Sequence, residues 1–164
     1  MRLEITGTWK GYFEFGEGYD EGIAGKKGYF IATLTEKNGV IEGTSQDTEG
    51  EGVVGEPATV KGFIEGDMIS FVKTYPCKYF YDEDGNLIKD AEAGPHEVTY
   101  VGYFNSGTLS FTGNWEIDTG LNVNVRAENI DDVLAYENDQ NYIPHPSDYY
   151  TLYDTGTWEL WRVK

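Results

Sequence analysis

The sequence predicts an all-β protein, an antiparallel up-and-down meander closed into a barrel of roughly eight strands. Its 164 residues include 21 glycines and 15% aromatic residues, a composition typical of short strands joined by tight turns. Apolar and polar side chains alternate along most of the chain, as they do in half-buried strands. The length suits one domain covering residues 1–164, because a chain of this size can bury a single adequate core.

The predicted strands follow one another with turn signals between them. The first runs from Ile5 to Phe15, and its apolar face carries Trp9. Lys37-Asn38-Gly39 predicts the tight turn after the second strand, because Asn and Gly tolerate positive φ angles. The other predicted strands are Gly28–Glu36, Val40–Asp47, Val53–Glu65, Met68–Tyr75, Glu97–Asn105, Thr108–Ile117 and Thr155–Val163.

An internal repeat supports the meander. Residues 62–75 and 102–115 share glycine, an aromatic residue, a turn, an apolar-Ser-Phe triplet and a closing aromatic residue. Two copies are too few for a solenoid or a propeller, so the repeat predicts two equivalent hairpins of one sheet.

Two long excursions interrupt the strand pattern, at residues 76–95 and 118–154. The first has the signal for its own small hairpin at Asp84-Gly85. In the second, Asn129 can cap a short helix that continues to Tyr136. Loops longer than about 15 residues are uncommon unless they are functional or disordered, so both excursions are candidates for a lid or a binding rim.

The charge of the chain restricts its partners. Its 29 acidic and 12 basic residues give a formal net charge of -17, which repels nucleic acid and anionic membranes and attracts basic proteins. The same charge can also serve solubility alone. One cysteine, Cys77, permits no intramolecular disulfide, and no signal core or membrane-spanning stretch is evident, so we expect a cytoplasmic protein.

Gly7-Thr8-Trp9 at the head of the first strand and Arg162 in the last strand resemble the signature of the calycin barrels, the lipocalin and avidin group. The stretch from Tyr100 to Trp115 and then Asp118 also resembles the late strands of avidin-type proteins. The resemblance implies that Trp9 plugs one barrel end and that Arg162 packs across it as a cation over an aromatic face. It concerns architecture only, because the polar residues that hold biotin in avidins have no counterpart after Trp9.

A hollow barrel would offer an aromatic-lined site for a small apolar or amphipathic molecule, open at the end opposite Trp9. Tyr29, Lys73, Tyr75 and Tyr100 are the predicted lining residues. The alternative is that these side chains simply fill a packed barrel, which the sequence does not exclude.

No catalytic, metal or cofactor site is predicted. The two histidines, His96 and His145, show no metal-ligand spacing and are interpreted as surface residues. The acidic runs 82–86 and 47–51 lack EF-hand spacing and are interpreted as solvated tips.

Three functions remain open from the sequence. The leading hypothesis is a noncatalytic barrel that binds a small ligand, and the second is an acidic interaction or inhibitor domain for a basic partner. The third is a barrel enzyme that acts inside its cavity. The sequence does not determine the oligomeric state.

Overall fold

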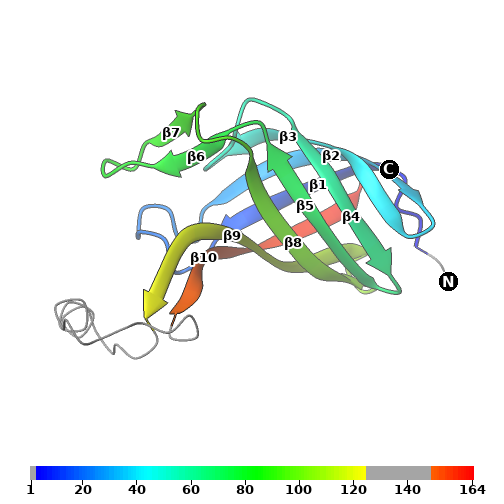
Figure 1. Ribbon diagram of the computed structural model, residues 1–164. Helices are drawn as coiled ribbons and strands as arrows, with labels where there is room; N and C mark the ends of the chain where they lie inside the picture. The colour runs from blue at the N-terminus through cyan, green and yellow to red at the C-terminus, as the bar shows by residue number, and fades with distance from the viewer. Residues whose placement is uncertain (1–2, 125–148) are drawn as a thin grey trace. The chain divides into compact units, whose positions relative to one another are not determined.

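A computed structural model describes residues 3–124 and 149–164 and forms an all-β barrel, with no helix among these residues. Eight antiparallel strands close in the order β1-β10-β9-β8-β5-β4-β3-β2, which confirms the predicted meander (Figure 1). The barrel strands are β1 (Gly7–Phe15), β2 (Lys27–Lys37), β3 (Val40–Gly50), β4 (Ala58–Glu65), β5 (Met68–Tyr75), β8 (His96–Asn105), β9 (Ser110–Asn124) and β10 (Tyr149–Arg162). A separate two-stranded sheet consists of β6 (Lys78–Tyr81) and β7 (Leu87–Asp90).

The predicted tight turns are present where the chain reverses. Asn38 and Gly39 have φ angles of 53° and 83°, so both central residues of the β2–β3 turn adopt the left-handed conformation. This pairs Lys37 with Val40 and sets the register of the hairpin. The predicted small hairpin in residues 76–95 is β6–β7, with Gly85 at φ 79° between its strands.

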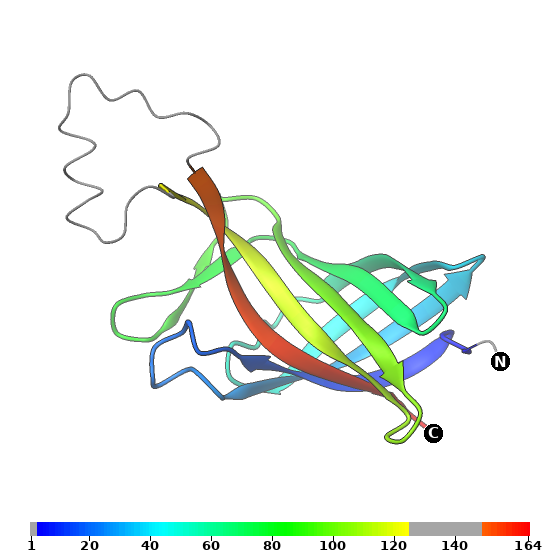
Figure 2. The same ribbon diagram turned by 90° about the horizontal axis from the view of Figure 1, so that it is seen from below.

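The repeated segments form hairpins of the same sheet, β4–β5 and β8–β9, but their registers differ. Glu65 pairs with Met68 in the first, whereas Asn105 pairs with Ser110 in the second. The second hairpin therefore has the longer turn, and the two are not equivalent in pairing. Figure 2 shows β8, β9 and β10 running side by side, in green, yellow and red.

Three predicted boundaries differ by several residues from the strand ends in the structure. β4 begins at Ala58 rather than at Val53, because Pro57 has no N–H to donate to a ladder and residues 51–57 form a connection. β9 continues to Asn124 and β10 starts at Tyr149, so both ends of the predicted 118–154 excursion are strand. The predicted helix at 129–136 lies outside the described residues.

The chain divides into two compact units. The first consists of residues 1–117 with 155–164 and contains the barrel. The second consists of residues 118–154, which include the distal parts of β9 and β10. Everything described below belongs to the first unit.

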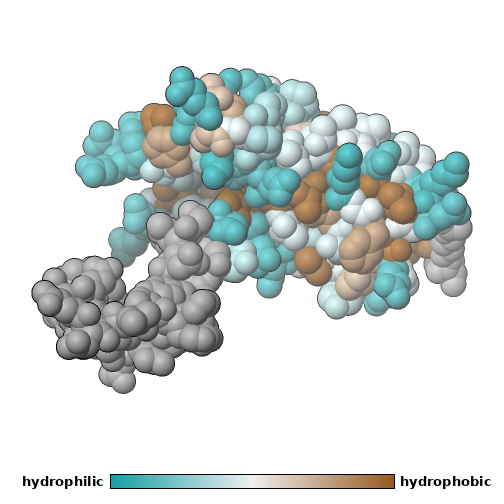
Figure 3. Space-filling model, viewed as in Figure 1, coloured by the Kyte–Doolittle hydropathy of each residue, from teal (hydrophilic) through white to brown (hydrophobic). Residues whose placement is uncertain are grey.

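Apolar side chains also occur on the outer face of the barrel, where Figure 3 shows brown patches between pale and teal side chains. They include Phe63 on β4 and Val101 and Tyr103 on β8, which are 45%, 41% and 57% exposed. Scattered apolar residues of this kind are normal on protein surfaces and do not by themselves indicate a binding site.

Aromatic side chains pack closely in the part of the interior where a glycine makes room for them. The Trp158 indole lies against Gly102, and its Nε1 donates hydrogen bonds to the carbonyls of Val101 and Asn114 at 3.3 and 3.0 Å. A Cβ added at Gly102 would lie 2.7 Å from the Trp158 ring and 2.3 Å from the Thr112 carbonyl oxygen. The neighbouring backbone leaves no room for a side chain at this position.

We therefore expect Gly102→Ala to lower the free energy of unfolding by about 3 kcal/mol, the cost of forcing atoms into a packed core. Gly22→Ala is the matched control, because a Cβ there would meet nothing within 4 Å. Urea denaturation of both variants measures the difference. Equal stability of the two variants would contradict the close packing at Gly102.

Candidate functional site

Polar side chains are enclosed at one region of the barrel interior. Ser45 and Asp47 on β3 and Lys73 on β5 are 1%, 7% and 0% exposed. Lys73 faces inward because β5 alternates strictly, with Ile69, Phe71 and Tyr75 on the same buried face. A lysine thus occupies an inward position where an apolar residue is the norm.

Aromatic rings surround the Lys73 amine. Its Nζ lies 3.2 Å from the centroid of the Phe30 ring, 4.9 Å from that of Tyr100 and 5.6 Å from that of Phe13. Within the described part of the chain, Nζ has no hydrogen-bond partner. The ring faces give the ammonium form some electrostatic compensation, but they do not replace the acceptors that water would supply.

Burial lowers the pKa of Lys73 from its ordinary value of 10.5 to about 7, although the charge of Asp47 acts in the opposite direction. Desolvation disfavours the charged ammonium and outweighs the attraction. Near neutral pH, a substantial fraction of the side chain is therefore the neutral amine, which is a nucleophile and a hydrogen-bond donor.

Asp47 is the buried carboxylate of this region. It accepts hydrogen bonds from the Tyr75 hydroxyl at 3.1 and 3.2 Å and from the Val54 backbone N–H at 3.0 Å. Burial raises the pKa of Asp47, and the charge of Lys73 and the two donors partly offset that effect. Burial is also the main reason that the pKa of Tyr75 lies well above its ordinary value.

A β-bulge follows Asp47. Tyr29 pairs with Glu49 and Phe30 pairs with Asp47, so Thr48 is the extra residue of β3. Asp47 therefore pairs with Phe30, whose ring lies under the Lys73 amine. We call the resulting group the Lys73 site; its members are Phe13, Phe30, Asp47, Lys73, Tyr75 and Tyr100.

Three of the four predicted lining residues, Lys73, Tyr75 and Tyr100, belong to this site. The fourth, Tyr29, lies on the outer face of β2, where its side chain is 38% exposed and packs against the ring of Tyr12 at 6.2 Å. Tyr29 cannot line the interior, because β2 turns the neighbouring Phe30 inward.

Sequence reasoning missed Asp47 and Ser45. The alternation that starts at the buried Ile41 continues through Ser45 to Asp47 and was the available signal. Interpreting 47–51 as a solvated tip is wrong for Asp47, because β3 continues to Gly50 and Asp47 is 7% exposed.

His96 is also not a surface residue: it begins β8 half-buried, and its Nδ1 accepts a hydrogen bond from the Tyr79 N–H at 3.4 Å. His145 lies outside the described residues.

Trp9 and Arg162 lie together at one end of the barrel. The two residues pair across β1 and β10, and the Arg162 guanidinium lies 5.9 Å from the centroid of the Trp9 ring. The guanidinium also donates hydrogen bonds to the carbonyls of Glu4 and Thr6 at 2.6 and 2.8 Å. Trp9, which is 3% exposed, donates from Nε1 to the Ile5 carbonyl at 2.7 Å.

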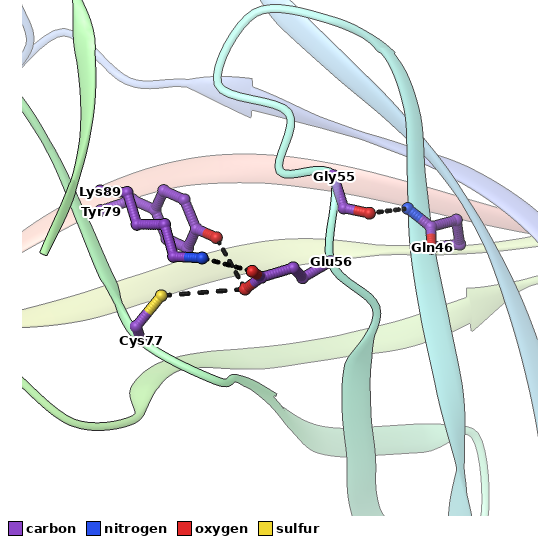
Figure 4. A network of polar contacts seen from close by, with 6 residues as sticks. All are labelled: Gln46, Gly55, Glu56, Cys77, Tyr79 and Lys89. Atoms are coloured by element: carbon purple, nitrogen blue, oxygen red, sulfur yellow. Dashed lines mark hydrogen bonds and ion pairs between the residues drawn. The ribbon is translucent and has the colours of Figure 1, made fainter. Parts of the chain in front are cut away.

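The other end carries the β6–β7 hairpin, and Figure 4 shows three of its contacts with Glu56 of the 51–57 connection. Glu56 accepts hydrogen bonds from the Tyr79 hydroxyl at 3.0 Å and the Cys77 thiol at 3.8 Å, and it forms an ion pair with Lys89. The hydrogen bond from Lys89 has the largest effect in lowering the pKa of Glu56, and the hydrogen bond from Tyr79 has the next largest. We call Glu56, Cys77, Tyr79 and Lys89 the Glu56 cluster.

A second contact reinforces this end. The Tyr81 hydroxyl donates to Glu51 at 3.1 Å, and the Tyr81 ring lies 6.0 Å from that of Phe15. At the acidic tip of the hairpin, the Asp82 carboxylate accepts hydrogen bonds from the backbone N–H groups of Asp84 and Asn86, which belong to the same turn. Among the described residues, no group of three His, Cys, Asp or Glu residues is arranged to hold a metal ion.

No helix in residues 3–124 or 149–164 is long and apolar enough to cross a lipid bilayer. A scan against protein-family models and searches of curated proteins and of solved structures found nothing that matches this chain.

Proposed function

We propose that this barrel binds a small amphipathic molecule with an apolar body and one hydrogen-bond-accepting head group, held by the Lys73 amine. The observation that carries the proposal is the fully buried Nζ, which has no hydrogen-bond partner among residues 3–124 and 149–164. A buried donor left unpaired costs about 1–3 kcal/mol, and an accepting group on a ligand would recover that cost. The rings of Phe13, Phe30 and Tyr100 offer apolar contact to the rest of the molecule.

A ligand reaches Lys73 only when one end of the barrel opens, because the side chain is 0% exposed. The β6–β7 end is the proposed entrance. Its main polar attachment is the Glu56 cluster, in which the Glu56 and Lys89 side chains are 39% and 47% exposed. Exposed ion pairs contribute little to stability, so this end opens at a lower cost than the Trp9 end.

A calycin-type relationship is part of the same proposal. It is supported by the closed eight-stranded barrel and by the Trp9 and Arg162 pair at the start of β1 and the end of β10. Calycin barrels hold small ligands in the interior, at a distance from the plugged end. The Lys73 site has this placement, since Tyr75 ends β5 near the β6–β7 hairpin.

The test compares two chemically matched probes, dodecanoate and dodecanol, by isothermal titration calorimetry below their micelle-forming concentrations. We expect dodecanoate to bind the native protein roughly tenfold more tightly, which corresponds to about 1.4 kcal/mol from the amine contact. Lys73→Met should abolish this preference while retaining most of the affinity for dodecanol.

Lys61→Met is the control variant, because Lys61 lies on the exposed face of β4. It should keep the preference for dodecanoate. The proposal fails if neither probe binds, or if Lys73→Met retains the preference.

A further inference from the structure

The Lys73 site holds a nucleophile that simple ligand retention does not require. We propose that Lys73 captures a ligand that is an aldehyde, forming an imine between Nζ and the carbonyl carbon. This inference rests on the proposed function, because it places the carbonyl group of the ligand at the same amine. It adds a ligand class and a reversible covalent bond.

The first argument is the surroundings of the amine. Nζ is enclosed by aromatic ring faces, is 0% exposed, and has no hydrogen-bond partner within the described residues that would hold its lone pair or its protons. Desolvated lysines in apolar pockets are the lysines that add to carbonyl groups, because the neutral amine is present near neutral pH. Burial lowers the pKa of Lys73 to about 7, in agreement with this geometry.

The second argument is the neighbouring proton carrier. Asp47 is a buried carboxylate that pairs with Phe30, the residue whose ring centroid lies 3.2 Å from the Lys73 Nζ, and it accepts a hydrogen bond from the Tyr75 hydroxyl. Burial raises the pKa of Asp47, so the carboxyl group takes up and releases a proton more readily near neutral pH than an exposed aspartate does. Imine formation needs such a group, because protons must move from nitrogen to oxygen.

The reaction balances without any further reactant. The neutral Nζ adds to the carbonyl carbon, a C–N bond forms, and the carbonyl oxygen takes up a proton to give a carbinolamine. Asp47 then returns a second proton to that oxygen, which leaves as water while the nitrogen lone pair forms the C=N bond. The two protons lost by nitrogen end in the water, and nothing is oxidised or reduced.

The aromatic rings also favour the product. When the imine nitrogen takes up a further proton from the Asp47 carboxyl group it becomes a cation, and at the position of Nζ this cation lies over the Phe30 ring face, 3.2 Å from its centroid. Enclosure of the site slows hydrolysis, because water has to enter for the C=N bond to break.

The test uses dodecanal with sodium cyanoborohydride, which reduces an imine to a stable secondary amine. The full chain is treated at about pH 7, where an exposed lysine is almost entirely ammonium. Intact mass should show one dodecyl group per chain, and peptide mapping should place it on Lys73 with at least roughly tenfold preference over any other lysine. Lys73→Met should lose this adduct, whereas Lys61→Met should retain it.

The outcomes separate this inference from the function on which it rests. Labelling of Lys73 that is lost in Lys73→Met supports the imine. Dodecanoate binding without any Lys73 adduct from dodecanal overturns the imine and leaves the binding function standing. Labelling spread over exposed lysines, equal in the native protein and Lys73→Met, also overturns it. Failure of dodecanoate, dodecanol and dodecanal alike overturns both proposals.

Discussion

The free energy of unfolding of the native protein is expected to rise with pH by about 3 kcal/mol more than that of Lys73→Met between about pH 7 and 9.5. The cause is the buried amine. In the unfolded chain the pKa of Lys73 returns to 10.5, whereas burial holds it to about 7 in the folded protein. Throughout this window the unfolded state binds more protons than the folded state, so raising the pH favours folding.

The measurement is a series of urea denaturation curves at closely spaced pH values. Lys73→Met retains the length of the side chain but cannot titrate, so it should lack the rise that Lys73 causes. Lys61→Met, on the exposed face of β4, should follow the native curve. If the free energy of unfolding depends on pH in the same way in the native protein and in Lys73→Met, the amine is hydrated in solution and the prediction is wrong.

Asp47→Ala is expected to lower the free energy of unfolding by about 3 kcal/mol near neutral pH. The substitution removes the acceptor for the Tyr75 hydroxyl and the Val54 N–H, and both donors stay buried without a partner. It also removes the charge that favours the ammonium form of Lys73. Thermal or urea denaturation measures the loss.

Glu49→Ala is the matched control for this prediction. Glu49 lies on the same strand two positions away and is exposed, so its removal should change stability by no more than about 0.5 kcal/mol. In a double-mutant cycle, Asp47→Ala combined with Lys73→Met should cost less than the two single losses added together, because the electrostatic coupling is removed once. Strict additivity would mean that Asp47 and Lys73 do not interact.

Much of the fold follows from local sequence patterns. The tight turn at Asn38-Gly39 and the period-two alternation of β5 are properties of neighbouring residues, so they can be predicted without knowledge of the tertiary structure. The start of β4 was predicted too early because apolar residues at 53–54 resemble a strand, although Val54 instead donates its N–H to Asp47. That contact joins the connection after β3 to a side chain of β3 itself, and the apolar pattern at 53–54 gives no signal of it.

The site was only partly predictable for a related reason. Lys73 stands out because it interrupts an apolar alternation, whereas Asp47 is followed by further acidic residues and resembles a surface position. The inward orientation of Asp47 continues the alternation of Ile41 and Ser45, and the bulge at Thr48 interrupts that pattern only after Asp47. A shift of a single residue exchanges the two faces of a strand, so composition alone could not assign Tyr29 and Asp47 to their faces.

Glu56 gathers three polar contacts of the β6–β7 hairpin in a single side chain. Tyr79, Cys77 and Lys89 all reach the same carboxylate, so a movement of that carboxylate releases three contacts together rather than one after another. Because the Lys89 contact is an exposed ion pair, dissolved salt weakens it far more than it weakens the buried contacts around Lys73. Increasing ionic strength should therefore weaken the polar contacts at the β6–β7 end and have little effect on the buried contacts around Lys73.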